Sequence, residues 1–162
     1  MSMICELLAV PEGTARRVMS TPRQIHDLLA APGNPDQRLS LEKSWHGLHF
    51  ALTGSAWDGE KPLNFLVSGG EPVGDEDIGY GPARVLFAED VASLDQALGN
   101  VSDDKFQHGF DLRSLQAAEI YPEIWDEPRE DLLAEYGGYF HELQAFVHRA
   151  AQGGQALVIT LT

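Results

Sequence analysis

The stretch of sequence that decides the fold is residues 129–161, REDLLAEYGGYFHELQAFVHRAAQGGQALVITL. Its first part has apolar residues at helical spacing, which predicts a long amphipathic helix with one face in the core. The apolar positions are Leu132, Leu133, Tyr136, Tyr139, Phe140, Leu143, Phe146, Val147, Ala150 and Ala151. Gly153 and Gly154 predict the end of this helix. The run at 156–161 is apolar on both faces and predicts a strand inside a sheet.

Two more apolar runs predict strands. Residues 3–10 are apolar apart from Glu6, and residues 83–88 read ARVLFA. The first and last strands are both apolar on both faces, so we expect them to lie close together in the sheet interior. The chain is therefore predicted to be an α+β protein. We expect a single compact domain over residues 1–162, in which several helices pack a small mixed sheet that includes the N- and C-terminal strands.

Helices are predicted between these strands. Ser40 is expected to cap a helix over residues 41–53, and Leu41, Trp45 and Leu48 would share one face of it. Trp45 is accordingly predicted to be a core residue. Further helices are predicted at residues 62–68, 89–98 and 111–118, and one is expected to start at Thr21 and Pro22.

The segment at 69–82, GGEPVGDEDIGYGP, is too rich in glycine and proline to predict a regular element. Long loops inside compact domains are often functional. A phosphate-binding loop would need a lysine, which this segment lacks, and it carries four carboxylates. A calcium loop of the EF-hand type starting at Asp75 would need glutamate where Leu86 stands. The segment is therefore predicted to be a long turn.

The charge balance limits the possible partners. Eleven basic residues against 25 acidic ones give a net charge of −14. Such a surface repels phosphate backbones and anionic lipids, so neither nucleic acid nor membrane is an expected partner. A basic protein would be steered toward it, although an acidic surface also serves solubility alone.

The N-terminal run and the cysteine content point to the cytoplasm. Cys5 is the only cysteine and lies in an apolar strand, where its thiol is expected to be inert. The first residues, MSMICELLAV, have no basic region of the kind that opens a signal peptide. No stretch is apolar for long enough to span a membrane.

His46 and His49 are the first candidate site residues. A spacing of three on a helix puts both imidazoles within reach of one ligand, with Glu42 one turn earlier. The pattern H-E-x-x-H of helical zinc sites is absent, so no metal is predicted. Hydrogen-bonded core histidines are the competing interpretation, and the position of His49 at the edge of the apolar face favours it.

Tyr80 and Arg84 are the second candidate pair. They leave the glycine-rich segment and could meet the histidine helix to form a small-molecule pocket. An ordinary alternative for Arg84 is an ion pair with one of the carboxylates at 69–82. No nucleophile motif and no cofactor motif is present.

Three segments together resemble one bacterial family. They are KSWHGLHFALTG at 43–54, SGGEPVGDEDIGYGPAR at 68–84 and AEIYPEIW at 118–125, followed by the long helix and the last strand. With the opening MSMICELLAV, they resemble the YfbM-like proteins, a domain family of unknown function. The resemblance implies a compact α+β domain without a known cofactor or activity. It points to recurring positions at Trp45, His46, His49, Gly70, Gly79, Tyr80, Gly81, Pro82 and Arg84.

Two classes of function follow. The first is an acidic interaction module that binds a protein partner, possible partners being basic proteins. The second is a small-ligand or enzymatic domain with a site near His46, His49, Tyr80 and Arg84. The sequence has no catalytic signature, which favours the first class and a protein that is not an enzyme.

Overall fold

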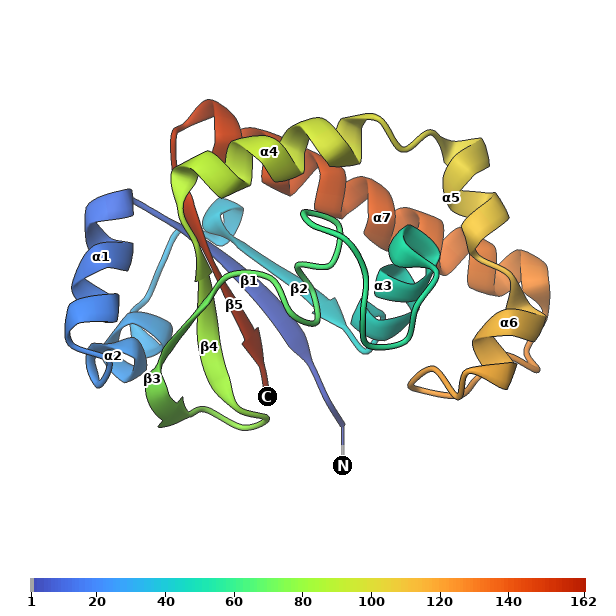
Figure 1. Ribbon diagram of the computed structural model, residues 1–162, viewed down its shortest axis with the longest axis horizontal. Helices are drawn as coiled ribbons and strands as arrows, with labels where there is room; N and C mark the ends of the chain where they lie inside the picture. The colour runs from blue at the N-terminus through green and yellow to red at the C-terminus, as the bar shows by residue number, and fades with distance from the viewer. Residues whose placement is uncertain (1) are drawn as a thin grey trace.

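The protein is built around a five-stranded antiparallel sheet, seen in a computed structural model that describes residues 2–162 (Figure 1). The strands are β1 (Cys5–Val10), β2 (Arg38–Glu42), β3 (Glu71–Asp77), β4 (Pro82–Leu86) and β5 (Ala156–Leu161), in the order β2-β1-β5-β4-β3. β1 pairs directly with β5, with Leu7 opposite Ile159 and Leu8 opposite Val158. The α+β class and the neighbouring interior position of the terminal strands are confirmed. The sheet is antiparallel at every pair of strands, however, and not mixed.

Helices cover both faces of the sheet, which explains why the central strands are apolar on both sides. On one face α1 (Glu12–Ser20) and α2 (Gln24–Ala30) bury Leu8 and Val158. On the other face Leu7 and Ile159 join a larger core. That core is formed by α3 (Trp45–Thr53), α4 (Ala88–Gly99), α5 (Asp103–Gly109), α6 (Leu112–Ala117) and α7 (Arg129–Gln152). Figure 1 shows α5 and α6 beyond β2, away from the other strands.

The long helix α7 is confirmed within the predicted bounds. Its buried residues follow the predicted apolar face: Leu132, Tyr136, Phe140, Leu143, Phe146, Val147 and Ala150. It ends at Gly153, and Gly154 has φ of 61°, a conformation that favours glycine. None of the helices formed by residues 2–162 combines the length and the apolar character that crossing a membrane requires.

The predicted helix over 41–53 is wrong in its first turn. Leu41 belongs to β2, the strand that pairs with β1, and it lies at a register shift between the two; α3 begins only at Trp45. Between them Glu42 adopts a left-handed φ of 49°, and the Ser44 hydroxyl donates to the Leu41 carbonyl at 2.6 Å. The apolar period seen in the sequence is thus shared by a strand and a helix. The burial of Trp45 is nevertheless confirmed, since 1% of it is exposed.

The segment between α3 and β4 differs most from the prediction. Residues 62–68 form successive turns and not a helix. Residues 71–77, predicted as a loop, form the edge strand β3. Pro72 is tolerated there because an edge strand leaves one side without ladder hydrogen bonds. Gly74 is required, since a Cβ atom at this position would lie 2.8 Å from the Pro22 ring.

Candidate functional site

His46 is a buried hydrogen-bonding residue in the first turn of α3. Its Nδ1 accepts the backbone N–H of Tyr121 at 3.0 Å, so the proton of the neutral ring resides on Nε2. Nε2 then donates to the Ala56 carbonyl at 2.8 Å. Burial of the ring lowers the pKa of His46 below its ordinary value. His46 therefore acts as a neutral link between α3 and two distant loops.

His49 lies one turn later in α3. Like His46, it binds the segment that connects α3 to β3. Its Nε2 donates to the Asp58 carbonyl at 2.8 Å, and the ring is fully buried. Nδ1 is buried and has no hydrogen-bond partner among the described residues. Burial lowers the pKa of His49 to about 4, and the backbone hydrogen bond only partly opposes that effect. Both histidines are thus core residues that hold main-chain carbonyls.

The two histidines fix the carbonyls on either side of Trp57. The Trp57 ring lies 4.4 Å from the His46 ring, centroid to centroid, and is nevertheless 59% exposed. Gly59 closes this loop with φ of 134°, where a Cβ atom would lie 2.7 Å from the Thr53 methyl group. The loop thus presents a large aromatic side chain to solvent on a fixed backbone.

Trp57 was missed by the sequence analysis. It belongs to no apolar period, and its neighbours Asp58, Gly59 and Glu60 are polar or flexible. A lone tryptophan among such residues was the signal that could have identified it, because nothing in its surroundings predicts burial.

Arg84 holds the second half of the same connecting segment. From β4 its Nη1 donates to the carbonyls of Phe65 and Gly69, and its Nη2 donates to the Leu66 carbonyl at 2.9 Å. Burial lowers the pKa of the guanidinium. The expected ion pair with a carboxylate of 69–82 is wrong, since Arg84 pairs with no carboxylate of residues 2–162. The carbonyls of an irregular segment need hydrogen-bond donors from elsewhere, and Arg84 donates to three of these carbonyls.

Tyr80 lies apart from this arrangement. It is 39% exposed in the turn between β3 and β4, where its backbone N–H donates to the Leu161 carbonyl at 2.9 Å. The structure therefore joins His46, His49 and Arg84 through one segment, residues 54–70, which all three bind by its carbonyls. Tyr80 contributes to a different turn.

Two cavities are lined by none of the four candidate residues. One, of about 320 Å³, separates the segment 61–71 from α4. It is lined by Lys61, Pro62, Asn64, Phe65, Gly69, Gly70, Glu71, Leu86, Asp90, Ser93 and Leu94. The other is a groove between α5 and α7. Within residues 2–162, no three histidine, cysteine, aspartate or glutamate side chains gather as a metal site would require. Burial raises the pKa of the Cys5 thiol to about 12.

The lowered pKa of His49 predicts that the folded protein loses stability in acid. Its pKa is about 4 in the folded protein and 6.5 without burial, so the unfolded chain binds the extra proton first as pH falls. The contribution of neutral His49 to the free energy of unfolding is therefore fully present above pH 6.5. It is lost progressively as pH falls toward 4, by about 2–3 kcal/mol. Urea denaturation across this pH range measures the loss.

His49→Gln is the informative variant for this prediction. Glutamine keeps a side-chain N–H for the Asp58 carbonyl but does not titrate, so we expect a flatter pH dependence of stability. His108 is exposed, and its side chain makes no hydrogen bond or ion pair with a described residue, so His108→Gln serves as the control and should leave the slope at its wild-type value. An equal slope in wild type and His49→Gln would contradict the prediction.

The comparisons with known proteins agree with the family resemblance. A model of the family described as "Domain of unknown function (DUF1877)" matches residues 1–160. The chain belongs to this family. It is 30% identical to Protein YfbM of Escherichia coli (strain K12) over 116 residues, which cover 70% of this chain and 64% of that protein. The chain is thus aligned with slightly less than two thirds of this relative.

The fold of this chain agrees with that of a solved structure. The crystal structure of YfbM from Escherichia coli, a protein of unknown function, superposes with a TM-score of 0.78 at 23% identity. The superposition covers 98% of this chain and 99% of that one. At this level of identity the similarity establishes the shared fold alone. The family and the neighbour thus support a YfbM-like domain of unknown function.

Proposed function

We propose that this domain is an interaction module that binds a basic segment of a protein partner, with Trp57 as the main contact residue. The observation that carries the proposal is the exposure of Trp57 on a loop whose backbone is held on both sides by buried histidines. Tryptophan is among the residues that contribute most to protein interfaces. A side chain presented on a fixed loop loses little freedom on binding, which favours affinity.

Charge indicates the nature of the partner. Asp58 and Glu60 follow Trp57 on the same loop; both are exposed, and neither makes an ion pair with a described residue. An exposed indole on a loop that also carries free carboxylates suits an arginine or lysine side chain, through cation–π attraction and charge. The net charge of −14 would accelerate the encounter with such a partner. The cytoplasm remains the predicted compartment.

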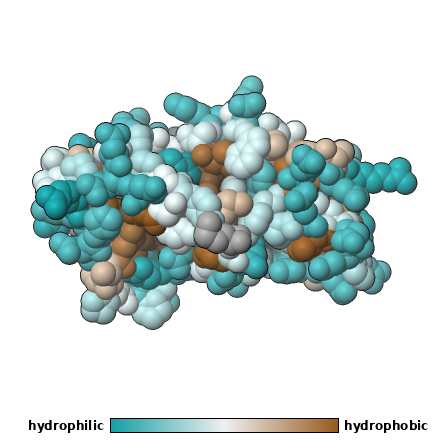
Figure 2. Space-filling view, turned by 90° about the horizontal axis from the view of Figure 1, so that it is seen from below, coloured by the Kyte–Doolittle hydropathy of each residue, from teal (hydrophilic) through white to brown (hydrophobic). Residues whose placement is uncertain are grey.

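The face in Figure 2 is mostly hydrophilic, with its apolar residues in separate small patches. A partner that recognised this domain by a broad apolar surface would need a larger continuous patch. The appearance of this face therefore supports recognition by charge and by single anchoring side chains.

Titration with a blocked hexa-arginine peptide tests the proposal. At about 0.15 M salt we expect Trp57→Ala to weaken its binding about tenfold, which corresponds to about 1.4 kcal/mol. Tyr80→Ala is the matched control, because Tyr80 is the other large exposed aromatic residue of the described chain, and it should bind within about twofold of wild type. The association rate should fall as salt rises. Equal binding by wild type and Trp57→Ala would overturn the proposal.

A second candidate function is small-molecule binding in the 320 Å³ cavity beside α4. The observation that favours it is Asn64, which is 8% exposed, lines the cavity and has a buried Oδ1 without a partner in the described chain. A ligand there would be excluded by filling the cavity through Ser93→Phe, whereas Trp57→Ala would leave its binding unchanged.

A further inference from the structure

A groove with a volume of about 490 Å³ lies between α5 and α7. The half-buried Leu133 and the exposed Ala134 contribute apolar surface to its lining, above the buried rings of Phe106 and Phe140. Asp103 and Glu130 also line it and add two carboxylates. The groove thus combines an apolar surface with negative charge.

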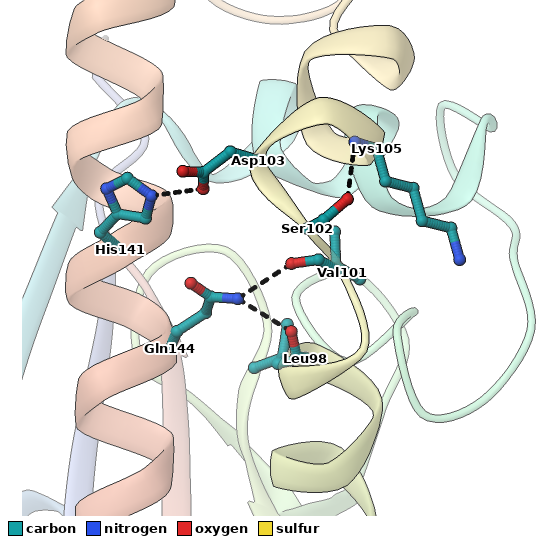
Figure 3. A network of polar contacts seen from close by, with 7 residues as sticks. All are labelled: Leu98, Val101, Ser102, Asp103, Lys105, His141 and Gln144. Carbon is teal, nitrogen blue, oxygen red and sulfur yellow. Dashed lines mark hydrogen bonds and ion pairs between the residues drawn. The ribbon is translucent and has the colours of Figure 1, made fainter.

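The two walls of this groove are tied together, as Figure 3 shows. His141 of α7 donates from Nε2 to the Asp103 carboxylate of α5 at 2.7 Å. Gln144 of α7 donates to the carbonyls of Leu98 and Val101, at 2.9 and 3.2 Å, which holds the chain that leads into α5. The groove is therefore preformed in the free protein.

Two glycines in the middle of α7 also line the groove. Gly137 and Gly138 each lower helix stability by about 1 kcal/mol relative to alanine. The packing of this chain does not require them, since a Cβ atom at either position would meet no atom within 4 Å. Gly47 is different, because a Cβ atom there would lie 2.6 Å from the Tyr136 ring. The pair at 137–138 is thus unexplained by the fold of the chain itself.

We propose that the groove is a docking site for an amphipathic helix with basic residues, supplied by a partner protein. The lining positions of α7 recur every three or four residues from Glu130 to His141, so they form one row along the helix. At 1.5 Å per residue this row is about 17 Å long, which matches about three turns of a docked helix. The glycines allow the docked backbone to approach closely.

The chemistry of the lining determines the occupant. The apolar face of the partner helix would contact Leu133 and Ala134, which are the accessible apolar residues of the lining, and its lysines or arginines would meet Asp103 and Glu130. Strand addition does not apply, because both walls are helices whose backbone hydrogen bonds are made internally. This surface goes beyond the loop of Trp57 and does not rest on it.

A blocked peptide of about 14 leucine and lysine residues, with leucines at helical spacing, is the probe. The test variant is Gly138→Gln, which places a side chain in the groove. Its matched control is Gly13→Gln, at an exposed glycine of α1 where a Cβ atom likewise meets nothing within 4 Å. Both variants should keep or raise the melting temperature, because each replaces a helical glycine.

We expect Gly138→Gln to weaken the peptide at least tenfold, and Gly13→Gln to bind like wild type. Circular dichroism should show that the peptide becomes helical on binding to wild type. Absence of binding to wild type, or equal binding by Gly138→Gln, would overturn the groove. Trp57→Ala separates the two surfaces: it should leave this peptide unaffected while it weakens hexa-arginine. Loss of this peptide in Trp57→Ala but not in Gly138→Gln would refute the groove and leave the proposed function standing.

Discussion

Replacement of Arg84 by methionine is expected to lower the free energy of unfolding by about 3–6 kcal/mol. The substitution keeps an apolar stem of similar length and removes three hydrogen bonds to the carbonyls of Phe65, Leu66 and Gly69. Those three residues are buried, so the carbonyls would lack water as a substitute partner. Each orphaned buried group costs about 1–3 kcal/mol. Because the three carbonyls belong to one segment that can shift as a unit, the losses are less than additive, and the total stays near the lower half of their sum.

Urea denaturation of the variant measures this loss. Arg16→Met is the matched control, since Arg16 is largely exposed and its contact with Glu12 at 3.6 Å is a surface ion pair. It should change stability by less than about 1 kcal/mol. Arg84→Lys should lie between the two, because an ammonium group cannot reproduce the forked geometry of a guanidinium. A loss no larger for Arg84→Met than for Arg16→Met would show that the segment 61–70 does not depend on Arg84.

Trp45→Ala is expected to cost about 3–5 kcal/mol. The indole is 1% exposed and stacks with the rings of His46 and Tyr121, at 4.9 and 5.9 Å between centroids. Its Nε1 donates to the Met3 carbonyl at 3.0 Å, which attaches the chain before β1 to α3. The variant would therefore leave both a cavity and a carbonyl without its donor.

Thermal and urea unfolding of Trp45→Ala measure this loss, and two further variants divide it. Trp45→Phe keeps most of the ring volume and loses the donor, so its loss should be smaller than that of alanine. Trp57→Ala removes the same side chain from an exposed position and should cost less than about 1 kcal/mol. An unfolding transition of Trp45→Ala equal to that of wild type would contradict the core position of this residue.

Local patterns predicted part of the candidate site correctly. The burial of His49 followed from its place at the edge of an apolar helical face, and its hydrogen bond to a main-chain carbonyl agrees with a core histidine. A binding role for His46, His49, Tyr80 and Arg84 stays a prediction. The structure adds that the donors of the two histidines and of Arg84 are used on the carbonyls of residues 56–69.

The sequence by itself determined the terminal strands, the helix α7, the acidic surface and the family. These properties are local or compositional: an apolar period, a glycine pair after a helix or a sum of charges can be read without knowing which segments meet. Only the tertiary structure decided the edge strand β3, the turns at 62–68 and the exposure of Trp57. The reason is that their hydrogen bonds come from distant residues. β3 is paired by β4, the turns are held by Arg84, and the loop of Trp57 is held by two histidines of α3, one of which also binds Tyr121.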